Sequence, residues 1–144
     1  MHTQTRAVWS FEAIGTSWTV ETDDPLSAEV RARVDRLIDA FDRSWSRFRD
    51  DSLVSQLAAS AGAVPAPGDA AAMLDAYAEL DAATSGAVNP LVGDALARLG
   101  YDARYSFIAG EPAAAPVDWR DRLRWHDGML TLDAPATIDV GALG

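Results

Sequence analysis

The chain has 144 residues, of which 12 are basic and 22 acidic, giving a formal net charge of −10. This length suits one domain, and 49% hydrophobic with 24% charged residues is typical of a folded globular chain. The acidic balance argues against nucleic-acid binding, which needs a basic face. Cysteine is absent, which excludes disulfides, thiolate nucleophiles and thiolate metal sites. Every basic residue is Arg, so Schiff-base and phosphate-loop lysines are excluded as well.

The two ends of the sequence carry separate expectations. Residues 1–6 contain no apolar stretch of the secretory type, and no run of about 18 apolar residues occurs anywhere. We therefore expect no signal peptide, no lipid-bearing Cys, no transmembrane segment and a cytoplasmic location by default. Residues 138–144 form an apolar, Gly-rich run without a polar tail. This run predicts that the chain is a fragment of a longer protein.

Hydrophobic spacing, capping residues and turn residues predict an alternation of strands and helices. In chain order, the expected elements are strands over 7–22, a helix over 26–45, a short helix over 53–57 capped by Ser52, a helix over 69–84 capped by Asp69, a helix over 89–99, a hairpin over 123–132 and a strand over 137–141. Strands, then helices, then strands favour an α+β fold with an antiparallel sheet over a wound parallel sheet.

The connecting segments are expected to be irregular. Gly15-Thr16 is either a bend between two strands or a bulge in a single long one. Residues 62–68 contain two prolines and are expected to be a linker, whereas Asp127-Gly128 predicts a two-residue hairpin turn.

Residue types taken singly assign no active site. The sequence contains no HExxH, GxSxG or phosphate-binding glycine loop. His126 lies beside the hairpin turn and is expected to face solvent, as are the adjacent carboxylates Asp50 and Asp51. Trp45 and Trp125 are expected to pack in the core rather than to serve as stacking platforms.

Several segments taken in order carry more information than any residue alone. They contain IGTSW within 11–18, SRF and DSLVSQL within 46–57, SGAVNPLVG at 85–93 followed by GYD, and DVGALG at 139–144. Their order and spacing resemble the ApbE family, the FAD:protein FMN transferases. The family pattern is similar to MGTxW, then S-x-F/Y with DSx(I/V/L)SxLN, then SxGAFD, then G-F/Y-D, then DxG(A/G)x(A/G)KG. The resemblance spans almost the whole chain.

This resemblance implies an α+β, T-fold-like architecture, with residues 1–144 as a single domain, the N-terminal portion of a protein whose C-terminal half is absent here. It implies a Mg²⁺-dependent enzyme that cleaves FAD, transfers FMN to a Thr hydroxyl of a target flavoprotein and releases AMP. Some members instead hydrolyse FAD to FMN and AMP. FAD, Mg²⁺ and the acceptor flavoprotein are the implied cofactors and partners, with a homodimer as one option. Many members act at a membrane or outside the cytoplasm.

The resemblance also implies roles for individual residues. The flavin-binding positions are Ile14, Phe48, Ala87, Val88, Asn89 and Asp139. Ala142 matches the position that gives Mg²⁺ an oxygen ligand, which here must be a backbone carbonyl. Gly86, Gly93 and Gly141 would let the backbone approach the ligand closely. No catalytic residue is assigned.

Each of these positions has an ordinary structural alternative. Ile14 and Val88 could be core residues, Asn89 a helix cap, and Asp139 a polar residue on the exposed face of a strand. The whole chain could likewise be a non-catalytic flavin- or partner-binding module, or a structural piece that needs another chain to complete its sheet. Val88 and Asn89 stand where the family has Phe and Asp, which is consistent with the non-catalytic alternative. The chain alone is expected to be inactive.

Overall fold

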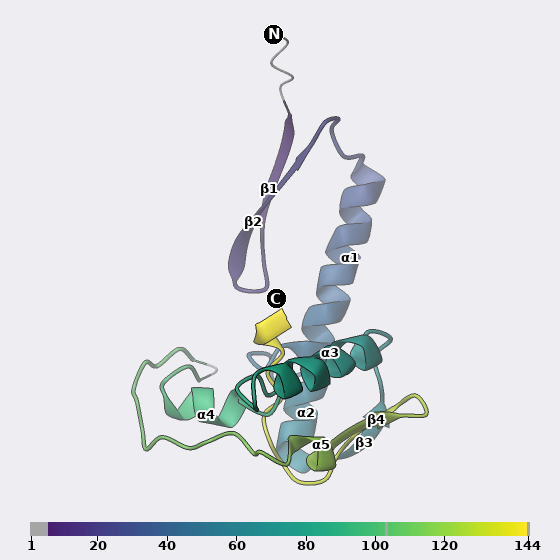
Figure 1. Cartoon of the computed structure of the whole chain (residues 1–144). Helices are drawn as coiled ribbons and strands as arrows, with labels where there is room; N and C mark the ends of the chain where they lie inside the picture. The colour runs from purple at the N-terminus through teal and green to yellow at the C-terminus, as the bar shows by residue number, and fades with distance from the viewer. Residues whose placement is uncertain (1–5, 103, 144) are drawn as a thin grey trace. The chain divides into compact units, whose positions relative to one another are not determined.

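A computed structural model describes residues 6–102 and 104–143 (Figure 1). Its elements are β1 (Ala7–Ala13), β2 (Thr16–Thr22), α1 (Ala28–Trp45), α2 (Leu53–Ser60), β3 (Gly62–Pro65), α3 (Ala70–Ala83), α4 (Gly93–Arg98), α5 (Trp119–Arg122), β4 (Leu123–His126), β5 (Met129–Leu132) and the 3-10 helix η1 (Gly141–Leu143). The chain divides into two compact units, residues 1–42 and 43–144. The expectation of a single domain stays a prediction, and the expectation about a signal peptide falls mainly on residues 1–5, outside the described residues.

Unit 1 begins with a β-hairpin. Strands β1 and β2 pair antiparallel, ending with Ala13 opposite Thr16. The turn is Ile14-Gly15, whose φ values of 53° and 72° are the positive angles that a two-residue hairpin turn requires. Of the two alternatives, a bend between two strands is correct, and its turn lies one residue before the expected Gly15-Thr16.

The hairpin of unit 1 carries an aromatic face. Trp9 and Phe11 have ring centroids 4.3 Å apart, and Trp18 stacks on Phe11 at 6.3 Å. The guanidinium of Arg31 lies 5.4 Å from the Trp9 ring, a cation–π contact. No residue from 6 to 42 is buried, so Ile14 is not a core residue and the hydrophobic core of the described chain lies in unit 2.

Unit 2 contains an antiparallel sheet with the strand order β3-β5-β4. Asp127-Gly128 forms the predicted turn between β4 and β5, with positive φ at both residues. The prediction of a linker over 62–68 was wrong at its first half, because Gly62–Pro65 pairs with β5 as an edge strand. Pro65 is tolerated there because an edge strand leaves one side of its backbone unpaired.

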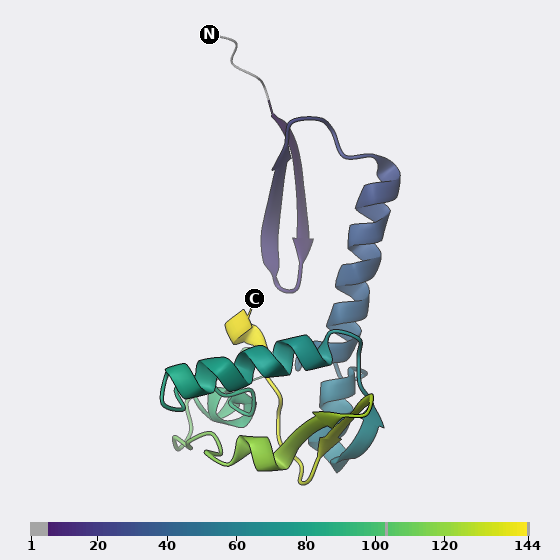
Figure 2. The same cartoon turned by 45° about the vertical axis from the view of Figure 1, so that its right-hand side comes forward.

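Helices cover this sheet and enclose the core of unit 2. The buried apolar side chains are Trp45, Val54, Leu57, Ala70, Leu74, Tyr77, Leu91, Trp119, Leu123, Leu130, Leu132, Ile138 and Val140. Helix α3 packs on β4 (Figure 2), and Trp125 Nε1 donates to Asp75 Oδ1 at 2.9 Å between them. The core role predicted for Trp45 is confirmed, and Trp125, half-buried, stacks on Trp119 at 5.9 Å. The α+β fold with an antiparallel sheet is confirmed.

Local capping signals were partly correct. Ser52 caps α2, because its Oγ accepts from the backbone N–H of Ser55 at 3.1 Å. Asp69 precedes α3 but makes no capping bond, and its Oδ1 accepts instead from Trp45 Nε1 at 3.1 Å. No helix within the described residues has the length and apolar composition needed to span a bilayer.

The closing segment, residues 137–143, is not the strand that its alternation predicts. Its backbone bonds go to the loop before α4 and to the start of that helix: Gly93 N donates to Thr137 O at 3.2 Å, and Asp139 N donates to Pro90 O at 2.8 Å. Thr137 Oγ1 also donates to Asp94 Oδ1 at 2.6 Å. These isolated hydrogen bonds stand in place of the regular backbone pairing of a strand, and η1 follows at Gly141–Leu143. A Cβ on Gly93 would lie 2.6 Å from Thr137 O, so this close approach requires glycine.

Candidate functional site

An ion pair between Arg47 and Asp139 lies at the centre of the candidate site in unit 2. Arg47 Nε is 2.5 Å from Asp139 Oδ2, and the two side chains are 9% and 15% exposed. Arg47 Nη1 also donates to the backbone carbonyl of Tyr101 at 2.6 Å. One guanidinium thus joins segments that lie far apart in the sequence. The alternative that placed Asp139 on an exposed strand face was wrong, because its carboxylate is mostly buried and paired.

Tyr77 holds the closing segment from the other side. Its hydroxyl donates to the backbone carbonyl of Asp139 at 3.1 Å and accepts from the N–H of Ala142 at 3.3 Å. Burial raises the pKa of Tyr77 to about 12, and the nearby Asp139 charge acts in the same direction. The hydroxyl therefore stays protonated near neutral pH and keeps its donor. Gly141 N donates to Asp139 Oδ1 at 2.8 Å, which completes the contacts of that carboxylate.

Phe48 belongs to an aromatic cluster next to this ion pair. Its side chain is 39% exposed, and the Tyr105 ring stacks on it with centroids 4.9 Å apart and planes 12° apart. The Arg47 Cζ lies 4.2 Å from the Phe48 centroid. Tyr101 and Phe107 extend the cluster, with an edge contact at 5.8 Å between them. The exposed aromatic surface thus adjoins the buried charge pair.

The loop that carries Tyr105 is fixed by a carboxylate. Asp102 Oδ1 accepts from the backbone N–H groups of Arg104 and Ser106 at 2.9 and 3.1 Å, and Ser106 Oγ donates to Oδ2 at 2.5 Å. These hydrogen bonds, the one from the Ser106 side chain first, lower the pKa of Asp102. Tyr105 and Phe107 have φ values of 49° and 52°, the left-handed region that bulky residues rarely adopt.

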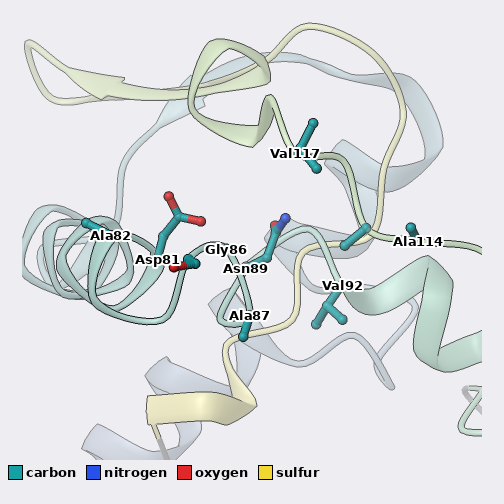
Figure 3. A pocket seen from close by; sticks show the side chains of 10 residues that line it. Asp81, Ala82, Gly86, Ala87, Asn89, Val92, Ala114 and Val117 are labelled. Atoms are coloured by element: carbon teal, nitrogen blue, oxygen red, sulfur yellow. The ribbon is translucent and has the colours of Figure 1, made fainter.

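A cavity of about 660 Å³ lies beside the loop between α3 and α4 (Figure 3). Its lining residues are Asp81, Ala82, Ser85, Gly86, Ala87, Asn89, Val92, Ala114, Ala115 and Val117. The small side chains on this wall leave the space open. Asp81 supplies a carboxylate to the wall and pairs with Arg120 at 3.5 Å.

Asn89 is buried and both ends of its amide are used within the chain. Its Oδ1 accepts from Leu91 N at 2.8 Å, and its Nδ2 donates to Pro116 O at 2.7 Å. The side chain therefore closes a tight turn and ties it to the segment before α5. The helix-cap alternative for Asn89 was wrong, because α4 begins later and its N-cap position is Val92.

The site residues expected from the sequence fall into separate groups. Phe48, Asp139 and Ala142 are joined through Arg47 and Tyr77, as the preceding contacts show. Ala87 and Asn89 line the cavity, whereas Val88, half-buried, does not. Ile14 is 47% exposed at the hairpin tip and belongs to unit 1, whereas the other expected site residues belong to unit 2. The ligand-binding roles of these residues stay predictions.

The described residues offer few donors for a metal ion. Within residues 6–102 and 104–143, no group of three or more His, Asp or Glu side chains could hold a metal ion. The Asp139 carboxylate is occupied by Arg47 and Gly141 N. The described residues therefore do not build a Mg²⁺ site, and the carbonyl of Ala142 would be one oxygen ligand of the several that Mg²⁺ requires.

The sequence alone assigned no role in the site to Arg47, Tyr77 or Tyr105. Arg47 stands inside the SRF motif, so its place beside Phe48 was a usable signal, although its partner is 92 residues away. Nothing in the local pattern marks Tyr105. His126, by contrast, is exposed as expected, with 65% of its side chain accessible.

Comparison with known proteins places this chain in a family. The model of the ApbE family matches residues 14–144. The comparison with curated proteins gives no match.

Solved structures with a similar fold belong to the same family. The apo flavinyl transferase ApbE of Pseudomonas stutzeri superposes with a TM-score of 0.75 at 20% identity, over 100% of this chain and 52% of that one. The flavin transferase ApbE of Vibrio cholerae gives 0.73 at 17% identity, over 94% and 48%. The ApbE protein of Thermotoga maritima gives 0.70 at 16% identity, over 95% and 48%. The chain thus spans about half the length of these proteins, whose likeness supports the fold. With the family model matching nearly all of its residues, the chain belongs to the ApbE family.

Proposed function

We propose that this chain is the flavin-binding part of a flavin transferase, which cleaves FAD, moves FMN to a Thr hydroxyl of an acceptor flavoprotein and releases AMP. Membership of the ApbE family supports the reaction class. The observation that carries the proposal is the network in which Arg47 and Tyr77 bring Phe48, Asp139 and Ala142 together from distant motifs.

The exposed aromatic surface suits a flavin ring. Phe48 is 39% exposed although Tyr105 stacks on its ring, and an isoalloxazine ring could pack against the open part of this aromatic surface. The cavity of about 660 Å³ lined by Ala87 and Asn89 is of the size that holds small organic ligands. Ala87 on its wall leaves room that a larger side chain would fill.

The pyrophosphate of FAD would need a cation in this acidic, Lys-free chain. The Arg47 charge is already neutralised by Asp139, so it is not free to balance phosphate. Mg²⁺ would supply that charge and polarise the phosphorus for attack when bound. The Ala142 carbonyl would contribute one ligand, with phosphate oxygens, water and groups other than the described residues completing the shell.

A second candidate is a flavin-binding module without catalysis. Asn89 replaces an acidic residue of the family pattern, and its amide is hydrogen-bonded to Leu91 N and Pro116 O. A side chain held in this way carries no charge, so it can supply neither the carboxylate that Mg²⁺ prefers nor a negative charge to the site. Flavin binding without AMP release would favour this candidate.

The test is to incubate the chain with FAD, with and without Mg²⁺, and to measure flavin fluorescence, AMP release and labelling of a Thr-containing acceptor. We expect FAD binding that Phe48→Ala weakens at least several-fold. Leu37→Ala is the matched control, because Leu37 is 71% exposed on α1 and belongs to no family motif. Wild-type protein that binds no FAD would refute the proposal. Mg²⁺-dependent AMP release would exclude the non-catalytic candidate, and FMN release without labelling would identify a hydrolase.

A further inference from the structure

Arg47 is not among the residues to which the family resemblance assigns a role, yet its side chain makes several contacts in the site. Its guanidinium meets the Asp139 carboxylate, the carbonyl of Tyr101 and the ring of Phe48 at once. The side chain is 9% exposed, so these contacts replace most of its hydration. A mostly buried arginine with these three partners holds them at fixed positions relative to one another.

The arrangement is specific to a guanidinium. Nε donates to Asp139 and Nη1 donates to Tyr101 O, two acceptors reached from one rigid plane. The same plane lies 4.2 Å from the centroid of the Phe48 ring. A lysine ammonium is a point charge on a flexible stem, and it could not hold both acceptors while stacking on a ring.

Asp139 connects Arg47 to the closing segment, residues 137–143. The carboxylate that Arg47 holds through Oδ2 accepts from Gly141 N through Oδ1, and Ala142 follows directly. The backbone N–H of Asp139 donates to Pro90 O, which lies next to Asn89 in the cavity wall. Moving the carboxylate would therefore loosen η1 and the segment that adjoins the cavity.

We propose that Arg47 is a positioning residue of the flavin site, which fixes Asp139 and residues 139–143 in place relative to the Phe48 ring. The inference rests on the proposed flavin function for its effect on ligand binding. The effect on the closing segment is independent of any ligand. Arg47 acts through its neighbours and contacts no phosphate, because its charge is paired with Asp139.

The experiment compares Arg47→Lys with Arg122→Lys in the 144-residue chain. Arg122 pairs with Asp118 on the surface, with side chains 44% and 48% exposed, and lies outside the site. The readouts are the FAD dissociation constant from flavin fluorescence and the hydrogen-exchange rates of the Gly141 and Ala142 amides, with amides of β5 as the internal reference. For Arg47→Lys we expect FAD binding about tenfold weaker, which corresponds to the loss of one charge-assisted hydrogen bond. We expect the Gly141 and Ala142 amides to exchange faster by a similar factor. Arg122→Lys should change neither.

Each outcome decides the proposal. Unchanged exchange at Gly141 and Ala142 overturns the positioning role, and faster exchange with unchanged FAD affinity overturns its importance for the ligand. If wild-type protein binds no FAD, the proposed function fails, while the exchange rates still decide whether Arg47 positions residues 139–143. Should Arg47→Lys fail to fold, Asp139→Asn serves instead, because the amide keeps an acceptor for Gly141 but loses the charge that holds Arg47. That variant must also bind FAD several-fold more weakly, or the proposal is wrong.

Discussion

Replacing Tyr77 by Phe removes the hydroxyl that joins α3 to the closing segment. Tyr77 is 1% exposed, and its OH donates to Asp139 O and accepts from Ala142 N. Leaving buried partners unsatisfied costs about 1–3 kcal/mol, so we expect the free energy of unfolding to fall by about 2 kcal/mol at pH 7. Urea denaturation measures this change, with an unaltered m value indicating that the fold is retained.

The same variant gives a sharper test through pH. The pKa of Tyr77 is raised from 10.0 to about 12 in the folded chain, so folding favours the protonated hydroxyl. A raised folded-state pKa stabilises the protein fully below pH 10, and the contribution is lost as pH rises from about 10 to 12. Two pKa units correspond to about 2.7 kcal/mol. Wild-type stability should therefore decline over this pH range by roughly that amount more than the stability of Tyr77→Phe.

A control and a refuting result complete this test. Tyr101 is 49% exposed, so Tyr101→Phe serves as the control and should lose little stability at pH 7. Denaturation curves of wild type and Tyr77→Phe that stay parallel from pH 9 to 12 would refute the reasoning. Equal stability of the two proteins at pH 7 would show that the hydroxyl does not hold the closing segment.

Three further predictions concern packing and surface charge. Gly93→Ala should lower the urea midpoint by the equivalent of about 1–3 kcal/mol, because the new Cβ would meet Thr137 O at 2.6 Å; wild-type stability would contradict this. Ser52→Ala should cost about 1 kcal/mol through loss of the α2 cap, and Ser52→Thr, which keeps a hydroxyl acceptor, should lose less if capping is the cause. Asp133→Asn, which breaks the exposed pair with Arg124, should change the free energy of unfolding by less than about 1 kcal/mol, and a larger loss would show that the pair is not a surface interaction.

The elements predicted correctly from the sequence are those that local chemistry determines. Helix α1 follows from apolar residues at helical spacing, and the β4–β5 hairpin follows from alternation around Asp127-Gly128, whereas the β1–β2 hairpin was one of two open alternatives. Ser52 is a correct cap because the residues that decide it lie within one helical turn. At each of these places the interacting groups are close in sequence, so the pattern and the structure agree.

The elements that were missed depend on partners far along the chain. β3 contains Gly62 and Pro65, which locally indicate a linker, and it becomes a strand because β5 pairs with it. Residues 137–141 alternate like a strand, but no strand within the described residues is hydrogen-bonded to them, and their backbone bonds instead to the loop before α4 and to the start of that helix. Arg47 illustrates the same limit for the site, since its acceptor lies 92 residues away.

Two glycines of the family motifs, Gly93 and Gly141, have a role in the structure that differs from the predicted one. Sequence reasoning reserved Gly93 and Gly141 for close approach of backbone to the ligand. In the structure Gly93 makes room for Thr137, and a Cβ on Gly141 would lie 2.9 Å from Asp139 Oδ1. Gly93 therefore lets the closing segment pack against the start of α4, and Gly141 lets that segment fold back onto Asp139. Arg47 and Tyr77 hold the same segment. Because these residues act on one segment, their substitution should weaken folding and flavin binding together. A residue that contacts the flavin directly should instead weaken binding with stability retained, and this difference is the criterion by which Phe48 can be told from its neighbours.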